Sequence, residues 1–74
     1  MEKFIKLFAE QFDEIDASLL KPETRFRELD GWSSLVALLV ITMVDEEYRV
    51  ILPPEEMRQT QTIQELFDLV SSKL

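Results

Sequence analysis

This chain contains neither cysteine nor histidine among its 74 residues. Disulfide bonds are therefore impossible, and zinc-finger or iron–sulfur sites lack their ligands. A chain of this size buries only about 60% of the surface that its unfolded form exposes, so a domain without such cross-links depends on efficient side-chain packing. Hydrophobic residues make up 46% of the sequence, while glycine occurs once and proline three times. This composition argues against disorder and against a β-rich fold with many tight turns.

Acidic residues outnumber basic ones by 15 to 8, which gives a formal net charge of -7. Such a charge repels nucleic acid and anionic lipid and favours basic partners. The longest apolar run, 35–44, is shorter than the roughly 20 residues that a membrane-spanning helix needs. The first residues also lack the pattern of a signal peptide. We therefore expect a cytoplasmic monomer that binds neither nucleic acid nor membrane.

Helical spacing of apolar residues predicts an all-α, small four-helix bundle in one domain over 1–74. The three main helices are expected at about 2–15, 34–48 and 62–73, and a short one-turn helix at 54–58. Thr62 and Glu65 have the spacing of a capping box at the start of the last helix. A proline at the first position of a helix is well tolerated, which fits Pro54.

A long polar connection, 16–33, separates the first two helices and contains Pro22, which would break a continued helix. Charged and polar residues surround Phe26 and Leu29 within this connection, and we expect these two side chains to anchor it to the core. Connections of this length are uncommon in compact domains and often serve a functional site when they are ordered.

The predicted second helix is apolar on two sides. One stripe is expected to face the core and contains Ala37, Val40, Ile41, Val44 and Tyr48. The opposite side, which should be polar on a solvent-exposed helix, is expected to contain Leu35, Val36, Leu39, Thr42, Met43 and Glu46. Two explanations remain open: the helix is central and buried on all sides, or the second side docks a partner.

Two serines, Ser33 and Ser34, stand directly before this helix. A serine there most often caps the helix by accepting a backbone hydrogen bond. With two serines, Ser33 can cap while Ser34 stays free at the first helical position, where a phosphate ester would meet a favourable field. A hydrolase nucleophile is excluded, because no histidine is present to act as a general base and no second glycine follows at the required spacing.

The order of elements, with Asp30-Gly31-Trp32-Ser33-Ser34-Leu35 before the central helix, resembles the acyl carrier protein family over nearly the whole chain. The segment Thr24–Leu35 looks like the approach to the Asp-Ser-Leu signature of that family, and Ser34 falls on the modified serine. The resemblance implies a non-enzymatic carrier with 4′-phosphopantetheine attached to Ser34 and acyl groups held as thioesters on its thiol. It also implies as partners a phosphopantetheinyl transferase and the acyl-loading and synthase enzymes of fatty-acid, polyketide or related biosynthesis.

Two features depart from the family pattern. Ser33 stands where aspartate is usual, and Trp32 replaces a smaller residue. Val36 and Leu39 occupy positions that are commonly acidic in fatty-acid carriers, so we expect partners to meet a more apolar surface, with Glu46 as its main acid. The alternative to the carrier is an acidic helical adaptor that is never modified and binds a partner through Leu35, Leu39 and Met43.

Overall fold

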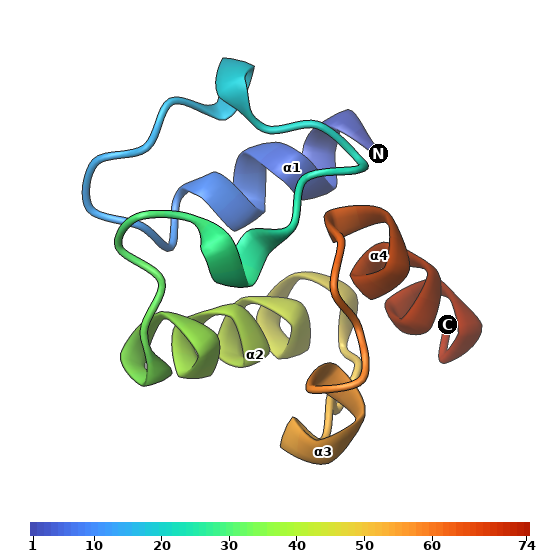
Figure 1. Ribbon diagram of the computed structural model, residues 1–74. Helices are drawn as coiled ribbons and strands as arrows, with labels where there is room; N and C mark the ends of the chain where they lie inside the picture. The colour runs from blue at the N-terminus through green and yellow to red at the C-terminus, as the bar shows by residue number, and fades with distance from the viewer.

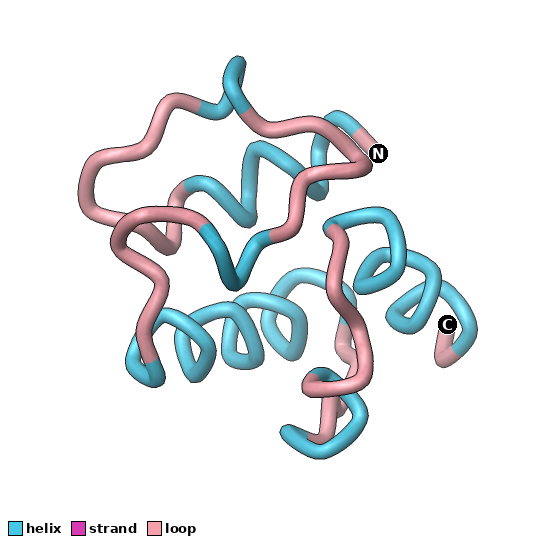
Figure 2. Tube along the Cα trace, viewed as in Figure 1, coloured by secondary structure: helices cyan, strands magenta, loops and turns pink.

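Four α-helices and two 3₁₀ turns form the regular structure, and the computed structural model describes residues 1–74 (Figure 1). The helices are α1 (Glu2–Ala9), α2 (Ser34–Tyr48), α3 (Pro54–Met57) and α4 (Ile63–Ser72), and the 3₁₀ turns are η1 (Ala17–Leu19) and η2 (Phe26–Glu28). Figure 2 shows helices joined by loops, without strands, which confirms the all-α prediction of three main helices and a short one. None of the helices combines the length and apolarity that crossing a bilayer requires.

Helix α1 is shorter than the predicted range of 2–15, and that part of the prediction is wrong. Beyond its end the amide of Phe12 donates to the carbonyl of Ala9, three residues back, at 3.1 Å. The side-chain amide of Gln11 donates to the carbonyl of Leu7 at 3.0 Å. Tight turns and side-chain donors of this kind satisfy the last carbonyls of a helix and end it. Phe12 nevertheless reaches the core, although it lies beyond the end of the helix.

The long connection between α1 and α2 is ordered by contacts with the segment that precedes α4. Phe26 in η2 is fully buried, and Leu29 packs against the core, so both predicted anchors are confirmed. Arg25 forms an isolated antiparallel bridge with Thr62. In the view of Figure 1 the connection passes above α1 and then descends to the start of α2. The packing of η2 therefore helps to fix where α2 begins.

An aromatic cluster forms the centre of the core under this connection. The ring of Phe8 is 5.7 Å from that of Phe26, 5.5 Å from that of Phe12 and 6.5 Å from that of Phe4 between centroids. The Trp32 ring lies nearly parallel to the Phe8 ring at 6.3 Å. Aromatic pairs at such separations add about 0.5 to 1.5 kcal/mol beyond the area that they bury.

Helix α2 turns a different face to the core than the sequence predicted. Its buried residues are Val36, Val40, Met43 and Val44. The prediction that Val36 and Met43 lie on the outer side is wrong, since their side chains are only 8% and 4% exposed. Nearly all of the first ten residues of this helix are apolar, and they are distributed around its whole circumference. The sequence therefore has no polar side that would define how the helix is rotated about its axis.

Helices α3 and α4 form as predicted. Pro54 is the first residue of the one-turn α3, and Thr62 and Glu65 form a capping box at the start of α4. An ion pair of 2.9 Å between Glu56 and Lys73 joins α3 to the end of α4. In Figure 1, α3 lies below α2 and α4 lies to its right, and Pro54, Met57 and Arg58 line a pocket together with residues of α2.

Candidate functional site

The two adjacent serines have different positions and partners. Ser33 is the N-cap of α2, and its hydroxyl oxygen accepts a hydrogen bond from the amide of Val36 at 3.2 Å. Ser34 is the first residue of the helix, is exposed, and its hydroxyl makes no hydrogen bond within the structure. The prediction that Ser33 caps while Ser34 stays free is confirmed. A free hydroxyl at a helix N-terminus is well placed to be esterified.

The approach to Ser34 is held by the turn that precedes it. Gly31 has a φ of 90°, a backbone conformation that residues with a side chain rarely adopt, so this turn depends on the single glycine of the chain. Trp32 follows, with its amide donating to the carbonyl of Leu29 at 3.1 Å and its ring 5.0 Å from the ring of Phe26. The Trp32 ring therefore packs over the end of the loop and positions the two serines.

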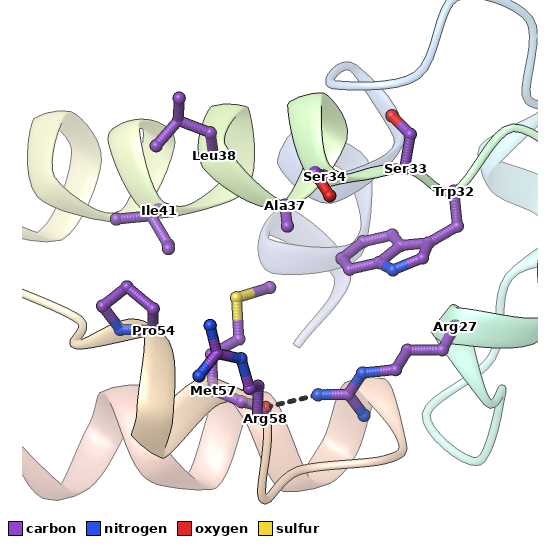
Figure 3. A pocket seen from close by; sticks show the side chains of 10 residues that line it. All are labelled: Arg27, Trp32, Ser33, Ser34, Ala37, Leu38, Ile41, Pro54, Met57 and Arg58. Atoms are coloured by element: carbon purple, nitrogen blue, oxygen red, sulfur yellow. Dashed lines mark hydrogen bonds between the residues drawn. The ribbon is translucent and has the colours of Figure 1, made fainter.

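A pocket of about 490 Å³ lies beside Ser34, between α2, α3 and η2 (Figure 3). Its lining residues are Arg27, Trp32, Ser33, Ser34, Ala37, Leu38, Ile41, Pro54, Met57 and Arg58. The contributions of α2 recur at helical spacing from Ser34, which is why they share one side of the helix. The volume is within the range of about 300 to 1,000 Å³ that is typical of small-molecule sites.

Arg27 holds the α3 side of this pocket against η2. Its guanidinium donates to the carbonyl of Met57 at 2.8 Å and also to the carbonyl of Thr60. The same group lies over the Phe26 ring, 5.0 Å from the centroid. Figure 3 shows Arg27 reaching from η2 toward the end of α3. The pocket is therefore braced by charge-assisted hydrogen bonds between segments that are distant in sequence.

Sequence reasoning missed most of this pocket. Leu38 was assigned to neither side of α2, although it is 59% exposed. Ala37 and Ile41 were predicted to be core residues; they are half-buried and pack against the core, and they also line the pocket. The spacing from Ser34 could have identified all three, since they follow it by three, four and seven positions. No sequence signal marked the residues of α3 or Arg27.

Only some of the residues that were predicted to bind partners are exposed on the outer side of α2. Leu35 and Leu39 are 64% and 39% exposed, and Thr42 and Glu46 are also exposed. Val36 and Met43 do not belong to this surface, because they are buried. We call the remaining residues, with Leu38, the outer face of α2. Such a row of exposed leucines is unusual for a helix surface that meets only water.

Ionisable groups with shifted pKa values lie outside the pocket. Hydrogen bonds from the amide and the hydroxyl of Ser18 lower the pKa of Asp16. Burial, with a smaller contribution from the charge of Glu47, raises the pKa of Tyr48. Neither group lines the pocket beside Ser34.

Comparison with known proteins identifies the family. A model described as "Phosphopantetheine attachment site" matches residues 2–70. The chain belongs to this family. A curated acyl carrier protein from Thermosynechococcus vestitus is 30% identical over 74 residues, which is all of this chain and 90% of that protein. No solved structure matches the chain. Phosphopantetheine attachment domains carry 4′-phosphopantetheine covalently, are modified by phosphopantetheinyl transferases, and are carriers without catalytic activity of their own.

The residues at the start of α2 fit this prosthetic group. Within the structure the amides of Ser34 and Leu35 donate no hydrogen bond, and the hydroxyl of Ser34 is exposed. A phosphate ester on this hydroxyl would therefore lie at the positive end of the helix dipole beside unused donors. The carrier domain also has a partly apolar pocket directly at this serine, large enough for a slender ligand.

Proposed function

We propose that Ser34 is the residue that carries 4′-phosphopantetheine, and that the domain carries acyl groups as thioesters for fatty-acid, polyketide or related biosynthesis. The family match supports the group, and the observation that supports the residue is the division of roles between the two serines. Ser33 uses its hydroxyl oxygen as the N-cap, whereas the Ser34 hydroxyl is exposed and unbonded. When bound, the group supplies a thiol, which this cysteine-free chain does not have.

The residues around Ser34 have distinct tasks in this proposal. Gly31 and Trp32 fix the turn that presents the serine, and the helix N-terminus stabilises the negative charge of the phosphate ester. Ala37, Ile41 and Met57 give the pocket an apolar wall, which would shelter part of the arm or its cargo from water.

We further propose that the outer face of α2 is where the transferase and the acyl-loading and synthase enzymes dock. Leu35 and Leu39 offer apolar surface close to Ser34, and Thr42 and Glu46 continue the same face toward the end of the helix. An enzyme that covers this face would lie directly beside the attachment serine. Apolar contact of this kind depends little on salt, in contrast to docking through acidic residues alone.

The test is modification of matched serine variants in vitro. The purified protein is incubated with coenzyme A and a broad-specificity phosphopantetheinyl transferase, and its intact mass is followed with time. Ser33→Ala should gain one phosphopantetheine, whereas Ser34→Ala should remain folded and unmodified. Labelling of Ser34→Ala at the parent's rate would show that the assignment is wrong. Absence of labelling in every variant, with a known carrier labelled in parallel, would favour the unmodified adaptor.

A further inference from the structure

The pocket beside Ser34 has a charge opposite to that of the chain. The sequence contains 15 acidic and 8 basic residues, yet two arginines and no carboxylate line this pocket. A random surface of this protein would show an excess of acids. The lining therefore forms a local positive region within a protein of net charge -7, beside the serine to which the prosthetic group is to be attached. Local fields of this kind attract anionic ligands.

The two arginines differ in how much of their hydrogen-bonding capacity is in use. Arg27 is held by its bonds to the carbonyls of Met57 and Thr60 and has a structural task. Arg58 follows α3 directly, and its exposed side chain makes neither a hydrogen bond nor an ion pair. Its guanidinium has five donors, arranged to match a carboxylate or a phosphate. Arg58 is thus the free cation of the pocket.

The positions in the pocket indicate which anion Arg58 would meet. Figure 3 shows Ser34 on the α2 side of the pocket and Arg58 on the α3 side, with Ala37, Ile41 and Met57 forming apolar surface nearby. A phosphate on Ser34 already has the N-terminus of α2 and its unused amides beside it. Beyond this phosphate the arm carries no charge, so an anion that pairs with Arg58 on the other side of the pocket has to come from the cargo at the end of the arm.

We propose that this pocket favours acyl cargo that ends in a carboxylate, with Arg58 as the residue that binds this terminal charge. The inference rests on the proposed attachment at Ser34 and adds the class of cargo to it. The apolar wall fits the methylene chain of such a cargo, and the guanidinium fits its end in a bidentate pair. A carrier pocket without a free cation would favour a methyl-ended chain instead.

The experiment compares two acyl groups of equal carbon number, adipoyl and hexanoyl. Each is installed on the full-length protein from its coenzyme A thioester by a phosphopantetheinyl transferase, and intact mass confirms complete loading. The rate of thioester cleavage by hydroxylamine then reports how well the cargo is sheltered. Arg58→Gln removes the proposed contact, and Arg49→Gln removes the same charge at the exposed end of α2, outside the pocket. Circular dichroism verifies that all variants are folded.

Arg58→Gln should speed cleavage of the adipoyl form by about threefold, a size typical of a partly exposed ion pair. It should leave the hexanoyl form unchanged, and Arg49→Gln should affect neither. The difference should disappear at about 0.5 M salt, where charge pairs are screened. Equal effects of Arg58→Gln on both cargoes, or none on either, would overturn the inference while leaving the carrier function intact.

A second readout separates the cargo from the phosphate of the arm. The side-chain Nε–H resonance of Arg58 is compared between the unmodified protein, the phosphopantetheine form and the two acyl forms. The proposal predicts that it shifts when adipoyl is attached and not when the arm alone is attached. A shift with the arm alone, and no further shift with adipoyl, would assign Arg58 to the phosphate and overturn the cargo proposal. Failure of any loading would count against the function of Ser34 itself.

Discussion

The exposed leucines of α2 lead to a quantitative prediction for the phosphopantetheinyl transferase. Complete transfer of a leucine side chain from water to apolar contact is worth about 1.5 to 3 kcal/mol. Leu39 is 39% exposed, so covering the remainder of its surface contributes about 0.6 to 1.2 kcal/mol. Leu39→Ala should therefore raise the KM for the protein by up to about eightfold. Leu39→Glu should cost about 1 to 3 kcal/mol, because docking would also remove water from a carboxylate.

The assay is initial-rate labelling with coenzyme A, analysed as separate kcat and KM at low and moderate salt. Leu19→Glu is the matched control, since this leucine is 73% exposed and lies in η1 rather than on α2. The KM effect of Leu39→Glu should exceed that of Leu19→Glu at both salt concentrations. The reasoning is refuted if Leu39→Glu unfolds the domain, which would make the position part of the core, or if its KM matches that of the control.

Three further predictions concern stability. Ser33→Ala removes the cap of α2 and should lower the free energy of unfolding by about 1 kcal/mol in a urea titration; an unchanged value would mean that the cap contributes nothing. Residues 45–47 are acidic and exposed in the last turn of α2, which contains no basic residue, so moderate salt should raise the melting temperature by about 2 to 5 °C; a flat or falling value would contradict this. Arg49 has a φ of 55°, a left-handed conformation that is strained for a residue with a side chain, so Arg49→Gly should raise the free energy of unfolding by about 0.5 to 1 kcal/mol at moderate salt. A lower urea midpoint for Arg49→Gly would show that this strain does not limit stability.

The ends of elements were predictable where a local rule acts alone. Thr62 and Glu65 fix the start of α4 by a capping box, and the serine pair fixes the start of α2. The end of α1 was not predictable, because apolar spacing continues to Ile15 while the backbone leaves the helix after Ala9. Its position depends on how the following loop packs, which is a tertiary effect.

The rotation of α2 about its axis is the part of the candidate site that the sequence could not predict. The location of Ser34 at the start of α2 follows from the sequence, because helix capping and the glycine turn are local properties of the chain. Which neighbours share its face does not, because a helix that is apolar on all sides has no amphipathic direction. Val36 and Met43 were therefore placed outside, and the pocket formed with Met57 and Arg58 of α3 was not anticipated. Contacts between segments about twenty residues apart are needed to define it.

The central claim, that Ser34 carries 4′-phosphopantetheine, is tested most directly by mass spectrometry of the protein purified from its native source. The intact mass should exceed that of the bare chain by one phosphopantetheine, alone or acylated. Fragmentation of the peptide that contains Ser33 and Ser34 should place the added mass on Ser34. A chain of unmodified mass from actively growing cells, or an added group on Ser33, would contradict the account.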